Sequence, residues 1–203
     1  MIVCFNVNAQ KTMTDSRDGE VYKTVTIDGD TWLAENLRFE TKKDSESWRG
    51  DSGKKTKTYA AILEQDKRYD KKHGRYYSYD AALKACPNGW TLPDESDFAK
   101  LSGKFGGDKK SGHSLKSKED WAWQTNGDNS SGFNAMPYGS IYNGKNSGKV
   151  EEAYFWVKGK VKDGKAPFRC FISRDGNFPS AFEFKLSSFT VAKIKMTIRC
   201  LKK

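Results

Sequence analysis

One stretch of the sequence predicts two helices and the turn between them. It reads Tyr-Tyr-Ser-Tyr-Asp-Ala-Ala-Leu-Lys-Ala-Cys over residues 76–86 and Pro-Asn-Gly-Trp-Thr-Leu-Pro-Asp-Glu-Ser-Asp-Phe over residues 87–98. Apolar residues of the first part follow the i, i+3, i+4, i+7 spacing of one helical face. This expected buried face consists of Tyr79, Ala82, Leu83 and Cys86. The helix should end at Pro87-Asn88-Gly89, because proline lacks a backbone N–H and glycine accepts the conformation that follows.

The second helix is expected to begin at Pro93 or Asp94 and to end at Gly106-Gly107. Asp94 can cap its N-terminus, where acidic side chains in the first turn also favour the positive end of the helix dipole. Its apolar side chains are Phe98, Leu101 and Phe105. We expect them to pack into the core.

Strand patterns lie on both sides of this stretch. Val21 to Ile27 predicts a strand, Asp28-Gly29 a tight turn and Thr31 to Ala34 the returning strand. From Lys193 to Cys200, apolar and mainly basic residues alternate, which predicts a half-buried strand with a basic face in water. The polar segments 41–58 and 107–118 are expected to be exposed loops, and residues 121–165 to be long loops between short strands.

The length of 203 residues corresponds to one domain, which we expect to span residues 10–203. The formal net charge is +10. Segment 100–118 carries six basic residues and one acidic residue, and segment 185–203 carries six basic residues and no acidic residue. This basic C-terminal half would attract an anionic polymer or an acidic partner, or it would simply keep the surface soluble. Lysine dominates over arginine, which disfavours bidentate recognition of phosphate. No apolar run approaches the length of a membrane-spanning helix.

Residues 1–9 resemble the end of a secretory signal, with Val7 and Ala9 at the small-residue positions before a cleavage site. Export would permit disulfides and would argue against a nucleic-acid partner. Three cysteines, Cys86, Cys170 and Cys200, would then remain. Either two of them pair, or the protein is cytosolic and all three are reduced and buried. No Cys-x-x-Cys pattern or Cys/His pair favours a zinc site.

The sequence carries no recognisable catalytic constellation. His73 and His113 lie in polar, lysine-rich segments and are expected at the surface, and no nucleophile motif accompanies them. We therefore expect a protein that is not an enzyme and has no cofactor. The aromatic side chains of residues 121–165 are better candidates, because exposed Trp and Tyr stack on sugar rings and anchor interfaces. Of these, Trp123, Tyr138 and Tyr142 are expected to be exposed and to bind the ligand.

The order of these signals resembles the Fibrobacter succinogenes major paralogous domain, a family of exported bacterial proteins. The resemblance covers about residues 18–202. It is carried by Asp18–Val25, Trp32–Leu37, Gly74–Tyr77, Ala81-Ala82, Cys86–Pro93, Phe98–Leu101, Gly132–Pro137, Tyr154–Trp156 and Ile198–Cys200.

This resemblance implies an α+β, C-type lectin-like fold, with two helices flanking small antiparallel sheets and long irregular loops. It also implies that Cys86 pairs with Cys200, leaving Cys170 as a buried thiol. Closing such a long loop would stabilise the fold by roughly 4–5 kcal/mol.

The triplets with which sugar-binding C-type lectins chelate calcium are absent, and Asp128-Asn129 is better explained as a turn than as calcium ligands. The resulting hypothesis is a secreted or cell-surface, calcium-independent module that binds a polysaccharide or a protein through a loop face at residues 121–165. The alternative is a structural or assembly subunit of the cell envelope, docking an acidic partner through the basic C-terminal half.

Overall fold

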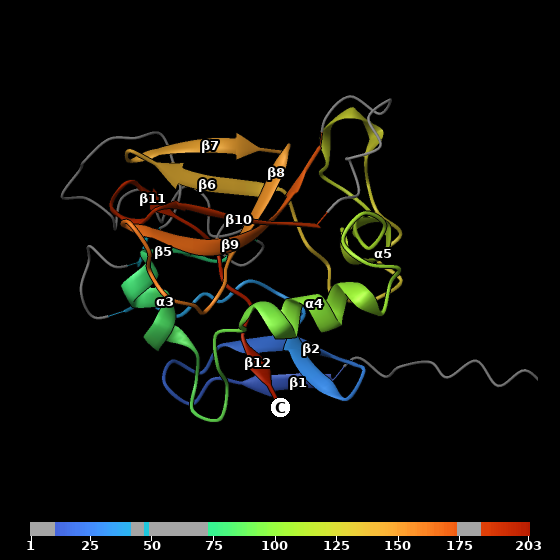
Figure 1. Cartoon of the computed structure of the whole chain (residues 1–203). Helices are drawn as coiled ribbons and strands as arrows, with labels where there is room; N and C mark the ends of the chain where they lie inside the picture. Colours follow the sequence, from blue (N-terminus) through green and yellow to red (C-terminus); the bar gives the residue numbers. More distant parts are fainter. Residues whose placement is uncertain (1–10, 42–46, 49–72, 174–183) are drawn as a thin grey trace, which may run out of the picture.

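The structure, a computed structural model, describes residues 11–41, 47–48, 73–173 and 184–203. Within these ranges the chain forms three β-sheets and three short α-helices (Figure 1). The α+β class expected from the sequence is therefore confirmed. In Figure 1 the four-stranded sheet lies at the bottom and the six-stranded sheet at the top, with the helices packed beside them.

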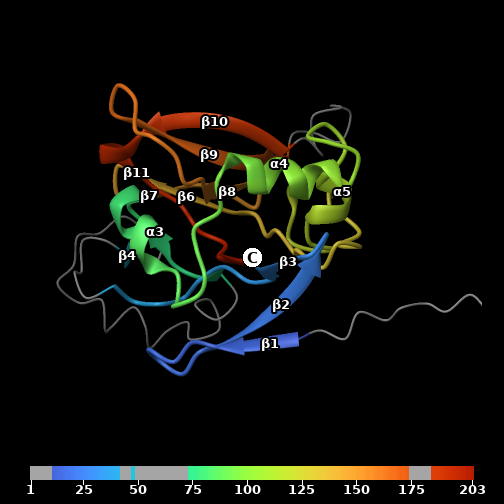
Figure 2. The same cartoon turned by 60° about the horizontal axis from the view of Figure 1, so that its bottom comes forward.

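The four-stranded sheet contains the hairpin predicted near the N-terminus. Its order is β1 (Lys11–Thr14), β2 (Val21–Ile27), β3 (Asp30–Leu33) and β12 (Leu201–Lys202). Asp28 and Gly29 both have positive φ, at 51° and 87°, as the tight turn of a two-residue hairpin requires. Figure 2 shows β1, β2 and β3 side by side, with the C-terminus of the chain close to β3.

The six-stranded sheet is formed by the second half of the chain. Its strands are β6 (Tyr138–Tyr142), β7 (Lys145–Lys149), β8 (Glu152–Trp156), β9 (Lys165–Ile172), β10 (Phe184–Thr190) and β11 (Ile194–Lys195). The order is β10-β9-β8-β6-β11, with β7 on β6. The expectation of antiparallel sheets is wrong for one pair, because β6 and β8 run parallel. A separate two-stranded sheet joins β4 (Ser47–Trp48) to β5 (Tyr76–Tyr77).

The first predicted helix is α3 (Tyr79–Ala85), whose N-terminus is capped by Ser78. Tyr79 and Ala82 are buried as expected, but Leu83 is 43% exposed. The expected apolar face is therefore wrong at this position. The small side chains of Ala81 and Ala85 complete the buried face instead, so that the helix packs closely against its neighbours.

The second predicted helix is α4 (Glu95–Gly103). Asp94 accepts a hydrogen bond from the Asp97 backbone N–H, and the Asp97 carboxylate accepts one from the Asp94 N–H, which makes a reciprocal capping box. Phe98 and Leu101 are buried in the core, and Phe105 packs against the same cluster from the turn beyond the helix. The helix thus ends earlier than the Gly106-Gly107 pair.

The C-terminal segment 194–202 differs from the single strand that the alternation predicts. Met196, Ile198 and Cys200 are buried as expected, but Thr197 and Arg199 are buried too. The prediction of a water-facing side holds for Lys193, which is exposed, and is wrong for Thr197 and Arg199, because the segment runs between the two larger sheets. It pairs with Tyr142 through Ile194 at one end and with Trp32 through Leu201 at the other.

The disulfide implied by the family resemblance is present. Cys86 and Cys200 are joined, with a Cα–Cα distance of 5.7 Å and a sequence separation of 114 residues. Cys170 lies in β9 and is buried. The bridge therefore connects the end of α3 to the C-terminal segment in the middle of the molecule.

Two segments expected to be loops have different outcomes. Segment 107–118 is not an exposed loop, because α5 (Gly112–Leu115) lies within it and both Leu115 and Lys116 are buried. Most of segment 41–58, and the whole of the expected signal remnant 1–9, lie outside the described residues. In the described ranges no helix has the length and apolar character needed to cross a membrane.

Candidate binding site

The three aromatic residues predicted to bind a ligand differ in exposure. Trp123, in the 3₁₀ turn η1 (Ala122–Gln124), is 56% exposed, and Tyr142, at the end of β6, is 37% exposed. Tyr138 is only 4% exposed, so its predicted exposure is wrong. Its ring packs edge-on against His73 at 3.7 Å, and its hydroxyl donates to the sulfur of Met136. The six-stranded sheet thus turns the first aromatic side chain of β6 inward.

The exposed Trp123 stands on an unusual backbone. Trp123 and Gln124 have φ of 58° and 55°, and Val150, in the turn between β7 and β8, has φ of 63°. Positive φ is uncommon for non-glycine residues and costly for a β-branched one. The backbone N–H of Ala122 donates to the Val150 carbonyl at 2.7 Å, which fixes the two turns to one another. Trp123 and the exposed side chain of Val150 are therefore held on neighbouring turns.

The buried Lys116 contacts residues next to the turn that carries Trp123. The Lys116 ammonium lies 3.8 Å from the centre of the Trp121 ring and donates to the hydroxyls of Thr125 and Ser173, both at 3.3 Å. Burial lowers the pKa of Lys116 to about 7. The Thr125 hydroxyl also donates to the Ala122 carbonyl at 2.9 Å. Lys116 is thus connected to the turn that carries Trp123.

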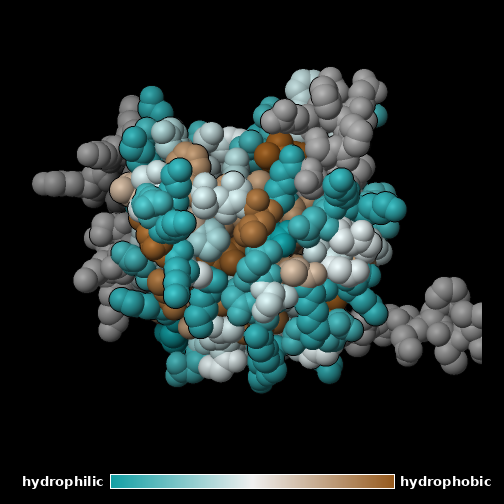
Figure 3. Space-filling model, viewed as in Figure 1, coloured by the Kyte–Doolittle hydropathy of each residue, from teal (hydrophilic) through white to brown (hydrophobic). Residues whose placement is uncertain are grey.

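The surface shown in Figure 3 is mainly hydrophilic, with a band of apolar surface across its centre. This face includes the region of the six-stranded sheet, as comparison with Figure 1 shows. Large apolar side chains that are exposed in this half of the chain include Val150, Val161 and Leu186. Apolar surface rimmed by polar groups is typical of interaction sites.

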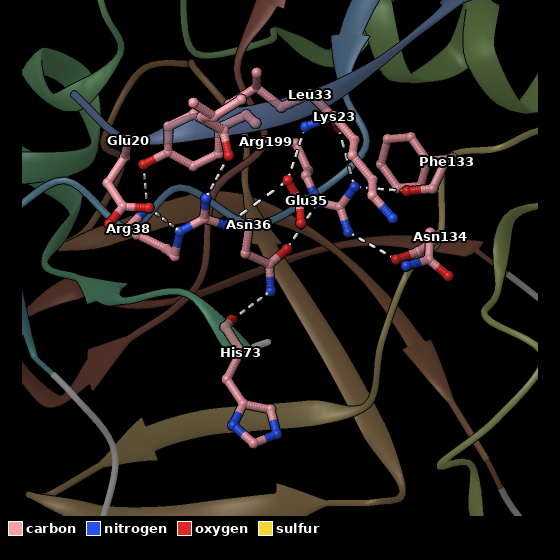
Figure 4. Close-up of polar contacts among 12 residues, drawn as sticks. Glu20, Lys23, Leu33, Glu35, Asn36, Arg38, His73, Phe133, Asn134 and Arg199 are labelled. Carbon is pink, nitrogen blue, oxygen red and sulfur yellow. Dashed lines mark hydrogen bonds and ion pairs between the residues drawn. The ribbon is translucent and has the colours of Figure 1, made fainter. Parts of the chain in front are cut away.

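A second candidate is a polar pocket of about 180 Å³ beside the four-stranded sheet. It is lined by Lys23, Ala34, Glu35, Asn36, Glu119, Asn134, Met136, Tyr138 and Arg199. Figure 4 shows Lys23, Glu35, Asn36, Asn134 and Arg199 converging from strands and loops that are far apart in the sequence. Tyr138, although buried, is therefore part of a concave site.

Arg199 forms the base of this pocket, with 1% of its surface exposed. Its Nε donates to Asn36 Oδ1 at 2.7 Å, its Nη1 to the carbonyls of Leu33 and Phe133 at 3.0 and 2.5 Å, and its Nη2 to the Asn134 carbonyl at 2.8 Å (Figure 4). Burial lowers the pKa of Arg199 to about 9, although the charge of Glu35 opposes this shift. The guanidinium is satisfied by neutral oxygen atoms and keeps its positive charge next to the pocket.

Charges of both signs surround the pocket. One carboxylate oxygen of Glu35 accepts the Lys23 backbone N–H at 2.8 Å and lies 3.7 Å from Nη1 of Arg38. Lys23 and Arg199 are cationic, whereas Glu35 and Glu119 are anionic. The formal charges of the lining therefore cancel.

The two histidines have different positions. His113 is exposed as predicted, with its Nε2 3.5 Å from Asp128 Oδ2. His73 is buried, so its predicted surface position is wrong; its ring lies against Tyr138 and its carbonyl accepts from the Asn36 amide. Asp128 accepts the Ser130 backbone N–H, as a turn residue would. Over the described residues, no group of three or more His, Cys, Asp or Glu side chains could hold a metal ion.

Sequence reasoning missed the pocket because its residues come from five separate stretches of the chain. The signal that could have found it is Arg199, a basic residue between apolar Ile198 and the disulfide-bonded Cys200. A buried arginine must have several acceptors, and these are supplied by the segments that line the pocket.

Comparison with known protein families matches residues 25–202 to the Fibrobacter succinogenes major domain. The chain belongs to this family. No curated protein and no solved structure is significantly similar to it. Within this Fibrobacter major domain, the segments 32–37, 132–137 and 198–200, which carry the resemblance in sequence, meet at the pocket and contribute Ala34, Glu35, Asn36, Asn134, Met136 and Arg199.

Proposed function

We propose that this Fibrobacter major domain is an exported, non-enzymatic binding module that recognises a polysaccharide through the loop face at residues 121–165, without calcium. The scaffold would be a C-type lectin-like fold, an assignment supported by the two helices, the Cys86–Cys200 bridge and the C-terminal segment between the sheets. One observation carries the proposal. It is the exposure of Trp123 beside Val150, on two turns with positive φ.

This geometry suits stacking on a sugar ring. An indole offers a large, rigid apolar face, and its N–H can donate to a hydroxyl group. Because the strained turns already hold Trp123 in place, little conformational entropy would be lost on binding. Strained backbone is also concentrated at ligand-binding sites in other proteins.

The alternative, a structural subunit docking an acidic partner through its basic C-terminal half, has weaker support. Lys116 and Arg199, two of the basic residues of this half, are buried. Lys100 pairs with Asp30 and Lys203 with Asp97, both at 2.8 Å. The basic surface available to a partner is therefore smaller than the sequence indicates.

The test is a screen of plant and bacterial polysaccharides for binding to the full chain, with and without EDTA and at low and high salt. We expect one glycan class to bind, with little effect of either treatment, because stacking on a neutral sugar is insensitive to screening. The Trp123→Ala variant should lose this binding, whereas Leu186→Ala, which removes an exposed apolar side chain from β10, should retain it.

Three results would contradict parts of the proposal. Loss of binding in EDTA would contradict calcium independence. Binding that high salt abolishes would favour the acidic-partner alternative. Equal binding by Trp123→Ala and the wild type would exclude Trp123 as a ligand contact and remove the observation that carries the proposal.

A further inference from the structure

We infer that the pocket above Arg199 is a subsite for a single neutral sugar ring. This inference rests on the proposed function, because it assigns the pocket to the same class of ligand. It adds a second contact region, made mainly of hydrogen-bonding groups, which shares the stretch 134–138 with the loop face and otherwise comes from other segments. The reasons are the charge balance of the lining, the kinds of atoms that face the pocket and its size.

Charge balance argues for a neutral ligand. Lys23 and Arg199 bring two positive charges to the lining, and Glu35 and Glu119 bring two negative ones. An anionic ligand such as a uronate would be attracted by the two basic residues and repelled by the two carboxylates. A cation would be attracted by the carboxylates and repelled by the basic residues. A ligand with hydroxyl groups and no charge avoids both penalties.

The lining atoms match hydroxyl groups, each of which is one donor and two acceptors. Glu35 uses part of its acceptor capacity on the Lys23 backbone N–H and the Arg38 guanidinium, and a carboxylate has about four lone-pair positions. The Lys23 ammonium and the amide of Asn134 add donors. Met136 and Tyr138 supply apolar wall against which the C–H groups of a ring can pack.

Size limits the ligand to one ring. A cavity of about 180 Å³ is well below the range of roughly 300–1,000 Å³ typical of pockets for larger organic ligands. At about 30 Å³ for each water molecule, it corresponds to a small cluster of waters that one ring could displace.

The pocket is also close to the loop face along the chain. Glu119 lines the pocket and Trp123 is four residues further on, which limits the distance between their Cα atoms to roughly 14 Å. A polysaccharide bound at Trp123 therefore has the pocket within reach of a neighbouring sugar unit.

The experiment uses the full chain with its disulfide intact and follows backbone amide signals by NMR during titration with methyl glycosides. The probes are the methyl glycosides of glucose, galactose, mannose, xylose and arabinose, with methyl glucuronide as the charged counterpart. We expect one neutral glycoside to shift the amides of Ala34, Asn36 and Asn134.

Three variants test the residues without removing Arg199. Lys23→Met keeps the aliphatic stem and removes the charge, and Asn134→Gly removes the amide while tolerating the φ of 56° at this position. Each should weaken glycoside binding by about tenfold, or about 1.4 kcal/mol. Lys160→Met, at an exposed lysine outside the lining, should bind as the wild type does. Thermal unfolding of each variant checks that the fold is retained.

Other outcomes separate this inference from the proposed function. If glycosides or the polysaccharide shift amides around Trp123 and none in the pocket, the subsite is excluded and the loop face stands. Tighter binding of methyl glucuronide than of methyl glucoside would overturn the assignment to neutral sugars. If neither the glycosides nor any polysaccharide binds, both proposals fail.

Discussion

Two buried arginines are stabilised in opposite ways. Arg169, in β9, lies against Asp108 and the Glu95 carboxylate, with Nη1 2.8 Å from Asp108 Oδ2. Burial lowers the pKa of Arg169, but the hydrogen bonds and charges of both carboxylates outweigh burial, and its pKa is raised. The hydrogen bonds that the structure describes for Arg199 go to carbonyl and amide oxygens and to no carboxylate, and burial lowers its pKa.

The difference shows what each region can do. At Arg169 the charges are neutralised within the domain, and the two carboxylates are still 41% and 44% exposed to water. At Arg199 all hydrogen-bonding partners are neutral: the side-chain amide oxygen of Asn36 and three backbone carbonyls that belong to two segments of the chain. Arg169 therefore joins β9 to Glu95 and Asp108, whereas Arg199 holds together the segments that line the pocket.

The largest effect is expected for Arg199→Met. The substitution would leave four acceptors without this donor, three of them in buried hydrogen bonds, and each unsatisfied buried group costs about 1–3 kcal/mol. We expect the free energy of unfolding to fall by at least about 4 kcal/mol, or folding to fail. Denaturant unfolding measures this effect. A loss no larger than that of a surface substitution would mean that the guanidinium does not hold these segments together.

The corresponding change at the other site, Arg169→Met, should cost less, about 2 kcal/mol. The carboxylates that it leaves behind are half-exposed, so water can solvate them.

Replacement of each arginine by lysine should affect the two positions differently. Arg169→Lys can still pair with Glu95 or Asp108 and should recover part of the loss. Arg199→Lys cannot reach four divergent acceptors and should recover little. Equal recovery at both positions, measured by denaturant unfolding, would contradict this view.

A third buried cation, Lys116, allows a test by pH. In the unfolded chain Lys116 keeps its proton up to about pH 10.5, whereas in the folded protein its pKa is about 7. Between these values the unfolded state binds more protons, so the free energy of unfolding of the wild type should rise with pH. The full cost of burying the charge is present below pH 7 and disappears as the pH approaches 10.5.

Lys116→Met should remove this dependence. We expect the variant to be more stable than the wild type at pH 6 by on the order of 2 kcal/mol, and the difference to shrink as the pH rises. The Thr125 and Ser173 hydroxyls still bond to one another without the lysine. Urea unfolding at several pH values measures the difference, with the exposed Lys118→Met as control. Parallel curves for Lys116→Met and the wild type would show that the buried amine does not titrate in this range.

The smallest effect on stability is expected for Trp123→Ala. Since the indole is mostly exposed, the free energy of unfolding should change by less than about 0.5 kcal/mol. A large loss of stability, measured by thermal unfolding, would show that Trp123 serves the fold and would weaken its proposed role in binding.

The elements predicted from the sequence were those that local patterns determine. The β2–β3 hairpin follows from alternation and the Asp28-Gly29 turn, and the start of α4 follows from Asp94 as its cap. The Cys86–Cys200 pair came from the family resemblance. These features depend on neighbours in sequence or on a known scaffold.

Positions where polar or amphipathic side chains are buried were not predicted. Lys116, His73 and Arg199 were expected at the surface because a charged or polar residue usually lies there. Whether such a residue is buried depends on acceptors contributed by distant segments, as the contacts of Arg199 with Leu33 and Phe133 show. No periodicity within one segment carries this information. The pocket was missed for the same reason, whereas exposed Trp123 and Tyr142 were identified by type and context.

The course of the C-terminal segment has a consequence for folding kinetics. Its partners lie far away in the chain: Arg199 bonds to Leu33 across a sequence separation of 166, and Cys200 to Cys86 across 114. Such contacts give a high contact order, and forming them requires the closure of long loops before they return any stabilisation. The domain is therefore expected to fold slowly. We expect the folding of the two larger sheets to become coupled when residues 194–202 dock between them.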